Sequence, residues 1–189
     1  ELYSLFLQSS GVTTDTRKIE KGQLYFALKG DNFNGNTFAD KAIEQGASYS
    51  IIDESKYAVH DQCILVDDVL STLQQLGNFH LNQVKPKAII GITGSNGKTT
   101  TKELVHVVLA TTYKTHYTKG NLNNHIGIPL TLLEMKNDTE IAVIEMGANH
   151  LHEIEGYCEY TLPTHGIITN TGKAHLEGFG GVEGVRKGK

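Results

Sequence analysis

A short run of residues in the middle of the sequence has the composition of a phosphate-binding loop. Gly94 and Gly97 are followed directly by Lys98 and Thr99. Glycines let backbone N–H groups turn toward an anion, a helix N-terminus adds partial positive charge, and a lysine there reaches the outer phosphates. The threonine hydroxyl is placed to ligate Mg²⁺. The residues that we predict to bind a nucleotide are Gly94, Ser95, Asn96, Gly97, Lys98, Thr99 and Thr100.

This loop departs from the general phosphate-binding pattern at one position. The pattern G-x-x-x-x-G-K-[ST] requires glycine at position 92, where this sequence has Ile92. A Gly-Lys-Thr triplet at the start of a helix is also common by chance. The flanking elements favour nucleotide binding, because the sequence predicts a buried strand over 88–93 and a helix without Gly or Pro over 99–110.

Further candidate ligands follow two other apolar runs. The run 141–144 ends in Glu145, and an acid at the end of a core strand beside a phosphate loop holds Mg²⁺; the alternative is a solvated carboxylate. His150 and His152 follow, either as a metal pair or as ordinary surface residues. His175 comes after the apolar run that ends at Asn170, and α/β ligand sites lie at such strand ends. The alternative is a hydrogen-bonded loop histidine, with Asn170 as a turn residue.

The elements that must position these residues form two predicted α/β domains. Pro86, between two lysines, interrupts both the helical and the strand pattern, so we expect domains over 1–85 and 86–189. In the first domain we expect a loop over 31–36 and a helix capped by Thr37. The helices expected there are 2–7, 37–45 and 69–83, and the strands are 23–28, 49–52 and 63–66.

In the second domain, strands and helices alternate, which predicts a doubly wound, mostly parallel sheet. The expected strands are 88–93, 114–117, 140–146 and 166–170, and the expected helices are 99–110, 127–135 and 151–159. The fold class is therefore α/β, with a small first domain and a phosphate-loop second domain that is truncated at the end of this sequence.

Composition limits the class of protein. The 189 residues are 39% hydrophobic and 20% charged, as in ordinary globular proteins. A net charge of −4 argues against a nucleic-acid partner. Cys63 and Cys158 are isolated, which argues against a disulfide framework or a zinc site. The sequence has no signal peptide and no apolar run of membrane length, so we expect a cytoplasmic protein.

Several separated motifs resemble those of the Mur ligases, which build the peptide of bacterial cell-wall precursors. The motifs are DTRKIEKGQLYFALKGDNFNGNTF at 15–38, TGSNGKTT at 93–100, GNLNNHIGIPLTLL at 120–133, EMGANH at 145–150 and NTGKAHLEGFG at 170–180. They cover nearly the whole chain in the order of the family. ALKGDNFNGNTF and EMGANH are most similar to the ligase that adds D-alanyl-D-alanine to UDP-N-acetylmuramoyl-tripeptide.

The resemblance implies a metal and phosphate site. It implies that Lys98 holds the phosphates of ATP, that Thr99 and Glu145 bind one Mg²⁺, and that His175 binds a second Mg²⁺. At the position of Lys189, the family has a lysine that reacts with CO₂ to form a carbamate. A carbamate offers anionic oxygen to Mg²⁺, whereas an ammonium cannot bind a cation.

The resemblance also implies substrate contacts. Asn123 and Asn124 match a loop that meets the substrate, and Thr16 and Arg17 match a region that contacts the uridine diphosphate. For the latter pair, the alternative is an ordinary turn with a surface arginine. The first domain is thereby identified with the UDP-binding domain of the family.

The activity implied by the resemblance is ATP-dependent amide-bond formation in peptidoglycan precursor synthesis by a monomeric cytoplasmic enzyme. Family members have a third, C-terminal domain that closes over ATP, and no part of this sequence matches it. We therefore expect the chain alone to bind but not to ligate, with Lys189 unmodified. Two alternatives remain open: the preceding Mur ligase, which adds the third amino acid, and a nucleotide-binding module without ligase activity.

Overall fold

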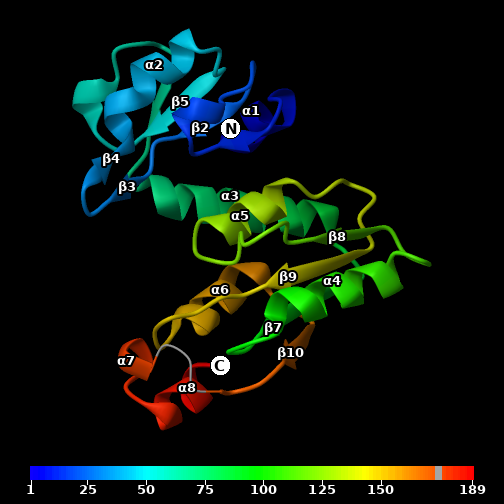
Figure 1. Cartoon of the computed structure of the whole chain (residues 1–189). Coiled ribbons are helices and arrows are strands. Elements are labelled where there is room, and N and C mark those ends of the chain that lie inside the picture. The colour runs from blue at the N-terminus through cyan, green and yellow to red at the C-terminus, as the bar shows by residue number, and fades with distance from the viewer. Residues whose placement is uncertain (173–175) are drawn as a thin grey trace. The chain divides into compact units, whose positions relative to one another are not determined.

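Two parallel β-sheets organise the chain, one in each of the units Glu1–Leu76 and Gly77–Lys189 (Figure 1). The computed structural model describes residues 1–172 and 176–189. The division between the units falls inside helix α3 (Val69–Val84). The domain boundary expected between residues 85 and 86 stays a prediction.

The first unit has a four-stranded sheet in the order β1-β2-β5-β6, in which all neighbouring strands are parallel. Its strands are β1 (Val12–Thr13), β2 (Leu24–Phe26), β5 (Tyr49–Ile52) and β6 (Cys63–Leu65). Its helices, besides the start of α3, are α1 (Leu2–Gln8), η1 (Thr16–Lys18), η2 (Gly35–Phe38), α2 (Ala39–Glu44) and η3 (Ser55–Tyr57). Every residue of β2 is fully buried, because the parallel sheet is covered on both faces.

Two local predictions in the first unit are wrong. The segment 31–36, expected as a loop, contains β4 (Phe33–Asn34), which pairs antiparallel with β3 (Lys29–Gly30) just before it. The expected helix does not begin at Thr37. The Asn34 side chain instead accepts a hydrogen bond from the Asn36 N–H and caps η2, while the Thr37 hydroxyl donates to the Asn34 carbonyl at 2.7 Å. An asparagine side chain suits this role because it bonds the backbone two residues on.

The second unit contains the predicted doubly wound, parallel sheet. Its strands follow the order β10-β7-β9-β8, and every neighbouring pair is parallel. The strands are β7 (Ala88–Thr93), β8 (Thr115–Tyr117), β9 (Ile141–Glu145) and β10 (His165–Ile168). The helices are α4 (Lys98–Leu109), α5 (Gly127–Leu133), α6 (Glu153–Thr161), α7 (Leu176–Phe179) and α8 (Val182–Gly188).

Alternating residues of β9 separate the two faces of this sheet. Ile141 and Val143 pack in one cluster with the partly buried Val105 and Leu109 of α4. Ala142 and Ile144 pack in another cluster, which also contains residues of α5, α6 and the end of α3: Ile128, Leu132, Tyr157 and Leu81. Successive side chains of a strand point to opposite faces of the sheet. Helix α4 therefore covers one face, and α5, α6 and the end of α3 cover the other (Figure 1).

Helix α4 exposes several apolar side chains and buries a charged one, which is the reverse of the usual distribution. Leu104, Val107 and Val108 are exposed by 63%, 62% and 67%, whereas the Lys102 side chain is fully buried. Lys102 precedes Val105 and Leu109 by three and seven residues, so it shares the face that packs on the sheet.

Within the described part of the chain, no helix combines the length and apolarity needed to cross a membrane.

Candidate functional site

The phosphate loop connects β7 to α4 in the predicted way. Two of its residues have positive φ, Gly94 (+141°) and Gly97 (+79°), and glycine adopts such angles readily. Gly97 is the N-cap of α4 and has no side chain with which to accept the first-turn N–H groups. Those groups, together with the helix dipole, are therefore available to an anion.

The segment that follows β10 holds the loop in shape. The Ser95 N–H donates to the Asn170 carbonyl at 3.0 Å, and the Asn96 N–H donates to Asn170 Oδ1 at 3.2 Å. In return, Thr169 Oγ1 donates to the Asn96 carbonyl at 2.6 Å. A Cβ at Gly94 would lie 2.0 Å from Thr169 Oγ1, so only glycine fits this close approach. Asn170 thus positions the phosphate loop, a role that its sequence position did not indicate.

Lys98 lies beside the loop at the edge of a cavity. Its Nζ donates to the Gly94 carbonyl at 2.7 Å, which places the ammonium over the phosphate loop. The cavity, of about 290 Å³, brings Lys98 together with two of the four predicted substrate residues, Asn123 and Asn124. Its remaining lining residues are His125, Gly147, Ala148, Asn149, Glu153 and Tyr157.

Glu145, at the end of β9, faces the start of α4. Its Oε1 accepts from Thr99 Oγ1 at 3.2 Å and from Asn123 Nδ2 at 2.8 Å. The residue is only 1% exposed, and its Oε2 has no hydrogen-bond partner among the described residues. A buried carboxylate oxygen without a donor, next to a threonine hydroxyl, is a donor set that suits Mg²⁺. Thr99 and Glu145 therefore fit the predicted metal.

Two buried residues of this site escaped the sequence analysis. Lys102 Nζ donates to the Thr118 carbonyl at 2.6 Å and lies 3.9 Å from Glu145 Oε2. Thr118 Oγ1 in turn accepts from the Glu145 N–H at 3.0 Å. The helical spacing of Lys102 with Val105 and Leu109 could have indicated that it lies on the buried face of α4. No comparable sequence pattern indicated Thr118.

Lys189 is held against the loop that follows β9. Its Nζ donates to the Ala148 carbonyl at 3.0 Å and lies 5.1 Å from the centroid of the Phe179 ring. The pKa of Lys189 is lowered from 10.5 to about 8, mainly by partial burial and also by the nearby charge of Lys98, while Glu153 opposes the shift. This amine is consequently more often neutral than that of an ordinary lysine.

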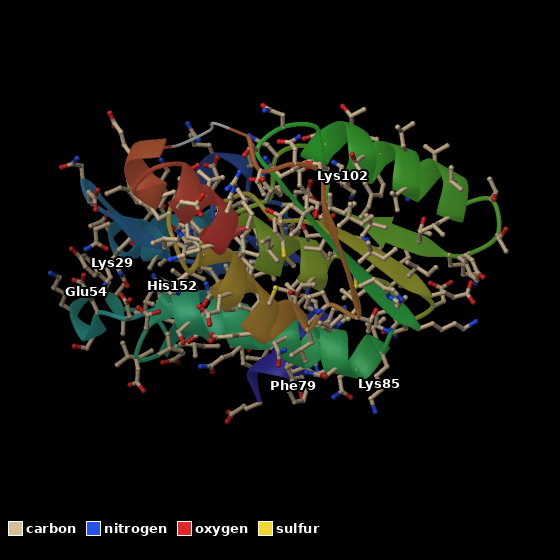
Figure 2. All side chains as sticks on the ribbon, turned by 90° about the horizontal axis from the view of Figure 1, so that it is seen from below. Lys29, Glu54, Phe79, Lys85, Lys102 and His152 are labelled. Carbon is tan, nitrogen blue, oxygen red and sulfur yellow. The ribbon has the colours of Figure 1, made fainter. Side chains whose placement is uncertain are left out.

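Of the three histidines predicted as possible metal ligands, the structure describes two. His175 lies outside the described residues. The His150 and His152 side chains are 68% and 82% exposed, and each ring pairs with a glutamate of α6: Glu153 at 3.7 Å and Glu155 at 2.7 Å (His152 is labelled in Figure 2). Among the described residues, no group of three or more His, Cys, Asp or Glu side chains forms a metal cluster. Both histidines are thus exposed residues that contact acidic side chains of α6, and their role as a metal pair stays a prediction.

Thr16 and Arg17 belong to η1 in the first unit. The Arg17 guanidinium forms a fork with Asp15, through Nε at 2.9 Å and Nη2 at 2.8 Å, and its side chain is 85% exposed. Hydrogen bonds from Arg17 lower the pKa of Asp15 to about 2. The arginine is therefore held at the surface by an ionised partner, in a position open to a phosphate.

Comparison with known proteins places this architecture in a family. The model described as Mur ligase middle domain matches residues 92–189, and the model described as Mur ligase family, catalytic domain, matches residues 8–89. The UDP-N-acetylmuramoyl-tripeptide–D-alanyl-D-alanine ligase of Bacillus subtilis is 46% identical over 181 residues, which are 95% of this chain and 39% of that protein.

Solved structures agree with these matches. MurF from Acinetobacter baumannii superposes with a TM-score of 0.87 at 36% identity, over 94% of this chain and 39% of that one. MurF ligase from Thermotoga maritima, in complex with ADP, gives a TM-score of 0.87 at 32% identity, over 97% and 42% of the respective chains. This chain thus spans about 40% of the length of these relatives. With both units matched, the chain belongs to the Mur ligase family and is MurF-like in its N-terminal and middle domains.

Proposed function

We propose that this chain supplies the ATP site and the UDP site of a ligase that joins D-alanyl-D-alanine to UDP-N-acetylmuramoyl-tripeptide. The observation that carries the proposal is the meeting of Lys98, Asn123 and Asn124 around one cavity, with Glu145 bonded to Asn123 and Thr99. A phosphate-binding lysine and a metal-binding carboxylate beside a substrate cavity are the parts that phosphoryl transfer requires. The likeness to MurF supports the choice of substrate.

The proposed reaction has two steps. A substrate carboxylate oxygen attacks the γ-phosphorus of ATP, the bond to the β-phosphate oxygen breaks, and an acyl phosphate and ADP result. The amine of D-alanyl-D-alanine then attacks the acyl carbon; phosphate leaves with the bonding electrons, and the nitrogen loses a proton. Lys98 and the N-terminus of α4 stabilise the negative charge on the transferred phosphate, and Asn123 and Asn124 orient the carboxylate. Bound Mg²⁺ supplies further charge neutralisation at Thr99 and Glu145.

A second metal position is proposed from His175 and Lys189. Carbamate formation requires a neutral amine to attack CO₂, and the lowered pKa of Lys189 favours that form. Its Nζ also lies near the loop that lines the cavity, through the bond to Ala148. These observations support Lys189 as the modified lysine of the complete enzyme, and we propose His175 as its partner ligand.

The first unit is proposed to hold the uridine diphosphate through Thr16 and Arg17. The exposed guanidinium of Arg17, pre-oriented by Asp15, is suited to a diphosphate because arginine donates bidentate hydrogen bonds. We further propose domains over 1–85 and 86–189, a monomer, and a cytoplasmic location, where ATP and nucleotide-linked precursors are available.

The proposal is tested by a ligation assay with two proteins. One is this 189-residue chain, and the other extends it to the length of its relatives. Each is incubated with ATP, Mg²⁺, UDP-N-acetylmuramoyl-tripeptide and D-alanyl-D-alanine, and the products are analysed by mass spectrometry. We expect pentapeptide product from the longer protein only, because the acyl phosphate forms only when reactants are held within about 3.5 Å in a closed site.

Three results would count against this proposal. In a parallel incubation that supplies UDP-N-acetylmuramoyl-dipeptide and free amino acids instead, a product with a single added amino acid would favour the preceding Mur ligase. Nucleotide binding without any ligation by the longer protein would favour a binding module. Product from the 189-residue chain alone would show that the two units suffice for catalysis.

A further inference from the structure

Lys102, in α4 of the second unit, is a fully buried lysine (Figure 2). Burying an ammonium costs several kcal/mol unless hydrogen bonds and opposite charges replace its water. Its Nζ has such partners: the carbonyls of Thr118 at 2.6 Å and Gly120 at 3.4 Å, and Glu103 Oε1 at 2.9 Å. Glu103 is half-exposed, so a lysine that only paired with it could do so at the surface without being buried. The two carbonyls therefore explain its burial better.

These carbonyls belong to the segment that leaves β8 and leads to the substrate loop. Thr118 is fully buried, and its N–H donates to the Val143 carbonyl at 3.0 Å. Further along, the Asn123 carbonyl accepts from the Gly147 N–H at 2.7 Å. Lys102 thus bonds helix α4 to the start of a segment whose far end, at Asn123, lines the cavity.

The same ammonium faces the metal-binding carboxylate. Glu145 Oε1 is bonded to Thr99 and Asn123, and Oε2, which lies 3.9 Å from Lys102 Nζ, has no hydrogen-bond partner among the described residues. The Glu145 N–H is bonded to Thr118 Oγ1. Lys102, Thr118 and Glu145 therefore form a closed set of contacts that links α4, the segment after β8 and the end of β9.

We propose that Lys102 is a positioning residue that fixes the segment 118–123 and Glu145 for binding of the metal–nucleotide complex. This inference rests on the proposed function. Because a lysine charge on its own repels a second cation, any benefit of Lys102 to Mg²⁺ binding must come from the order that it imposes on Glu145 and Asn123. Loss of Lys102 should therefore weaken the binding of ATP in Mg²⁺ if the lysine orders these residues. It should strengthen that binding if the lysine acts only through its charge.

The test uses the full 189-residue chain and its Lys102→Met variant, which keeps the apolar stem and loses the ammonium. Amide hydrogen exchange and the affinity for ATP, with Mg²⁺ and with EDTA, are measured for both. We expect exchange at 118–123 to be at least about 10-fold faster, because the opening of this segment loses its anchor. We expect the affinity in Mg²⁺ to fall about 10-fold, the effect of losing a group that orients a metal ligand, with the affinity in EDTA unchanged.

Two further variants complete the test. Lys87→Met, at an exposed lysine paired with Glu140, is the matched control and should behave as the original chain. Lys102→Arg keeps a charged donor and should restore the affinity for ATP in Mg²⁺. If Lys102→Met does not fold, exchange at 118–123 is compared between Lys102→Arg and the original chain. Retained protection then supports the inference, and lost protection overturns it.

Unchanged exchange at 118–123, or tighter ATP binding in Mg²⁺ for Lys102→Met, would overturn the inference. Equal losses in Mg²⁺ and in EDTA would reduce Lys102 to a general packing role and would also overturn it. Failure of the unchanged chain to bind ATP with Mg²⁺ would instead overturn the proposed function, and the exchange data would still decide on Lys102.

Discussion

Two lysines of α4 and one from the other end of the second unit lie near the proposed nucleotide site, and each has a different environment. Lys98 lies over the phosphate loop, Lys102 is fully buried, and Lys189 is packed on an aromatic ring. Their chemical roles differ accordingly. We propose that Lys98 binds phosphate and that Lys102 orders its neighbours, while Lys189 has an amine that is partly neutral near physiological pH.

For Lys98, we expect Lys98→Ala to lower the ligation rate of the longer protein by about 10²–10³-fold, because it removes the lysine charge from the phosphate loop. Phosphate release measures the rate, and circular dichroism checks the fold. Lys114→Ala, at an exposed lysine that pairs with Asp138, is the control and should retain the original rate. Near-normal turnover of Lys98→Ala would refute the phosphate-loop assignment.

For Lys189, the lowered pKa predicts a pH dependence of stability. Between pH 8 and its ordinary pKa of 10.5, the unfolded chain binds more protons than the folded chain, so the free energy of unfolding rises with pH across this window. Chemical unfolding at several pH values should show this rise, and Lys189→Met should remove it. Lys187→Met, in α8 two residues before Lys189, should leave the rise intact. A rise of equal size in Lys189→Met would contradict the assignment.

At the scale of elements, the strand–loop–helix unit depends on two glycines that differ in their surroundings. A Cβ at Gly94 would collide with Thr169 Oγ1, whereas a Cβ at Gly97 would meet nothing within 4 Å. We expect Gly97→Ala to cost only about 1–2 kcal/mol of left-handed strain. Gly94→Ala should cost more and should also abolish ATP binding, because it displaces the loop from Thr169.

Thermal unfolding and ATP titration of both variants measure these effects. Equal losses in the two variants would show that the contact with Thr169 has no bearing on the loop.

The sequence indicated the positions of strands and helices more clearly than which of their side chains are buried. The strand run 88–93 and the glycine loop after it carried strong local signals, and the structure has both. In α4, however, the apolar residues Leu104, Val107 and Val108 are exposed, whereas Lys102 is buried. The partners that decide this, Thr118 and Glu145, lie far away in the sequence, so no local pattern contains them. Thr169 and Asn170 were missed for the same reason.

At the scale of the whole molecule, the two units should respond to different ligands. In a heteronuclear NMR titration of the full chain, UDP-N-acetylmuramoyl-tripeptide should shift the amide signals of η1 and its surroundings, because Arg17 is the exposed donor there. ATP with Mg²⁺ should shift those of 94–100. The reverse pattern would exchange the proposed roles of the units.

The bonds between the phosphate loop and the segment after β10 also set the order in which this site is completed during synthesis. Ser95 is bonded to the carbonyl of Gly172, 77 residues further along the chain. A ribosome that adds about 5–20 residues per second needs roughly 4–15 s to cover that distance. During most of this interval the nascent chain lacks β10, one of the two strands that pair with β7, and Asn170, which bonds the backbone of the loop. If the proposed nucleotide site is correct, we expect nucleotide to stabilise the finished sheet rather than to guide its assembly, because the chain must be synthesised as far as Gly172 before the loop has all its partners.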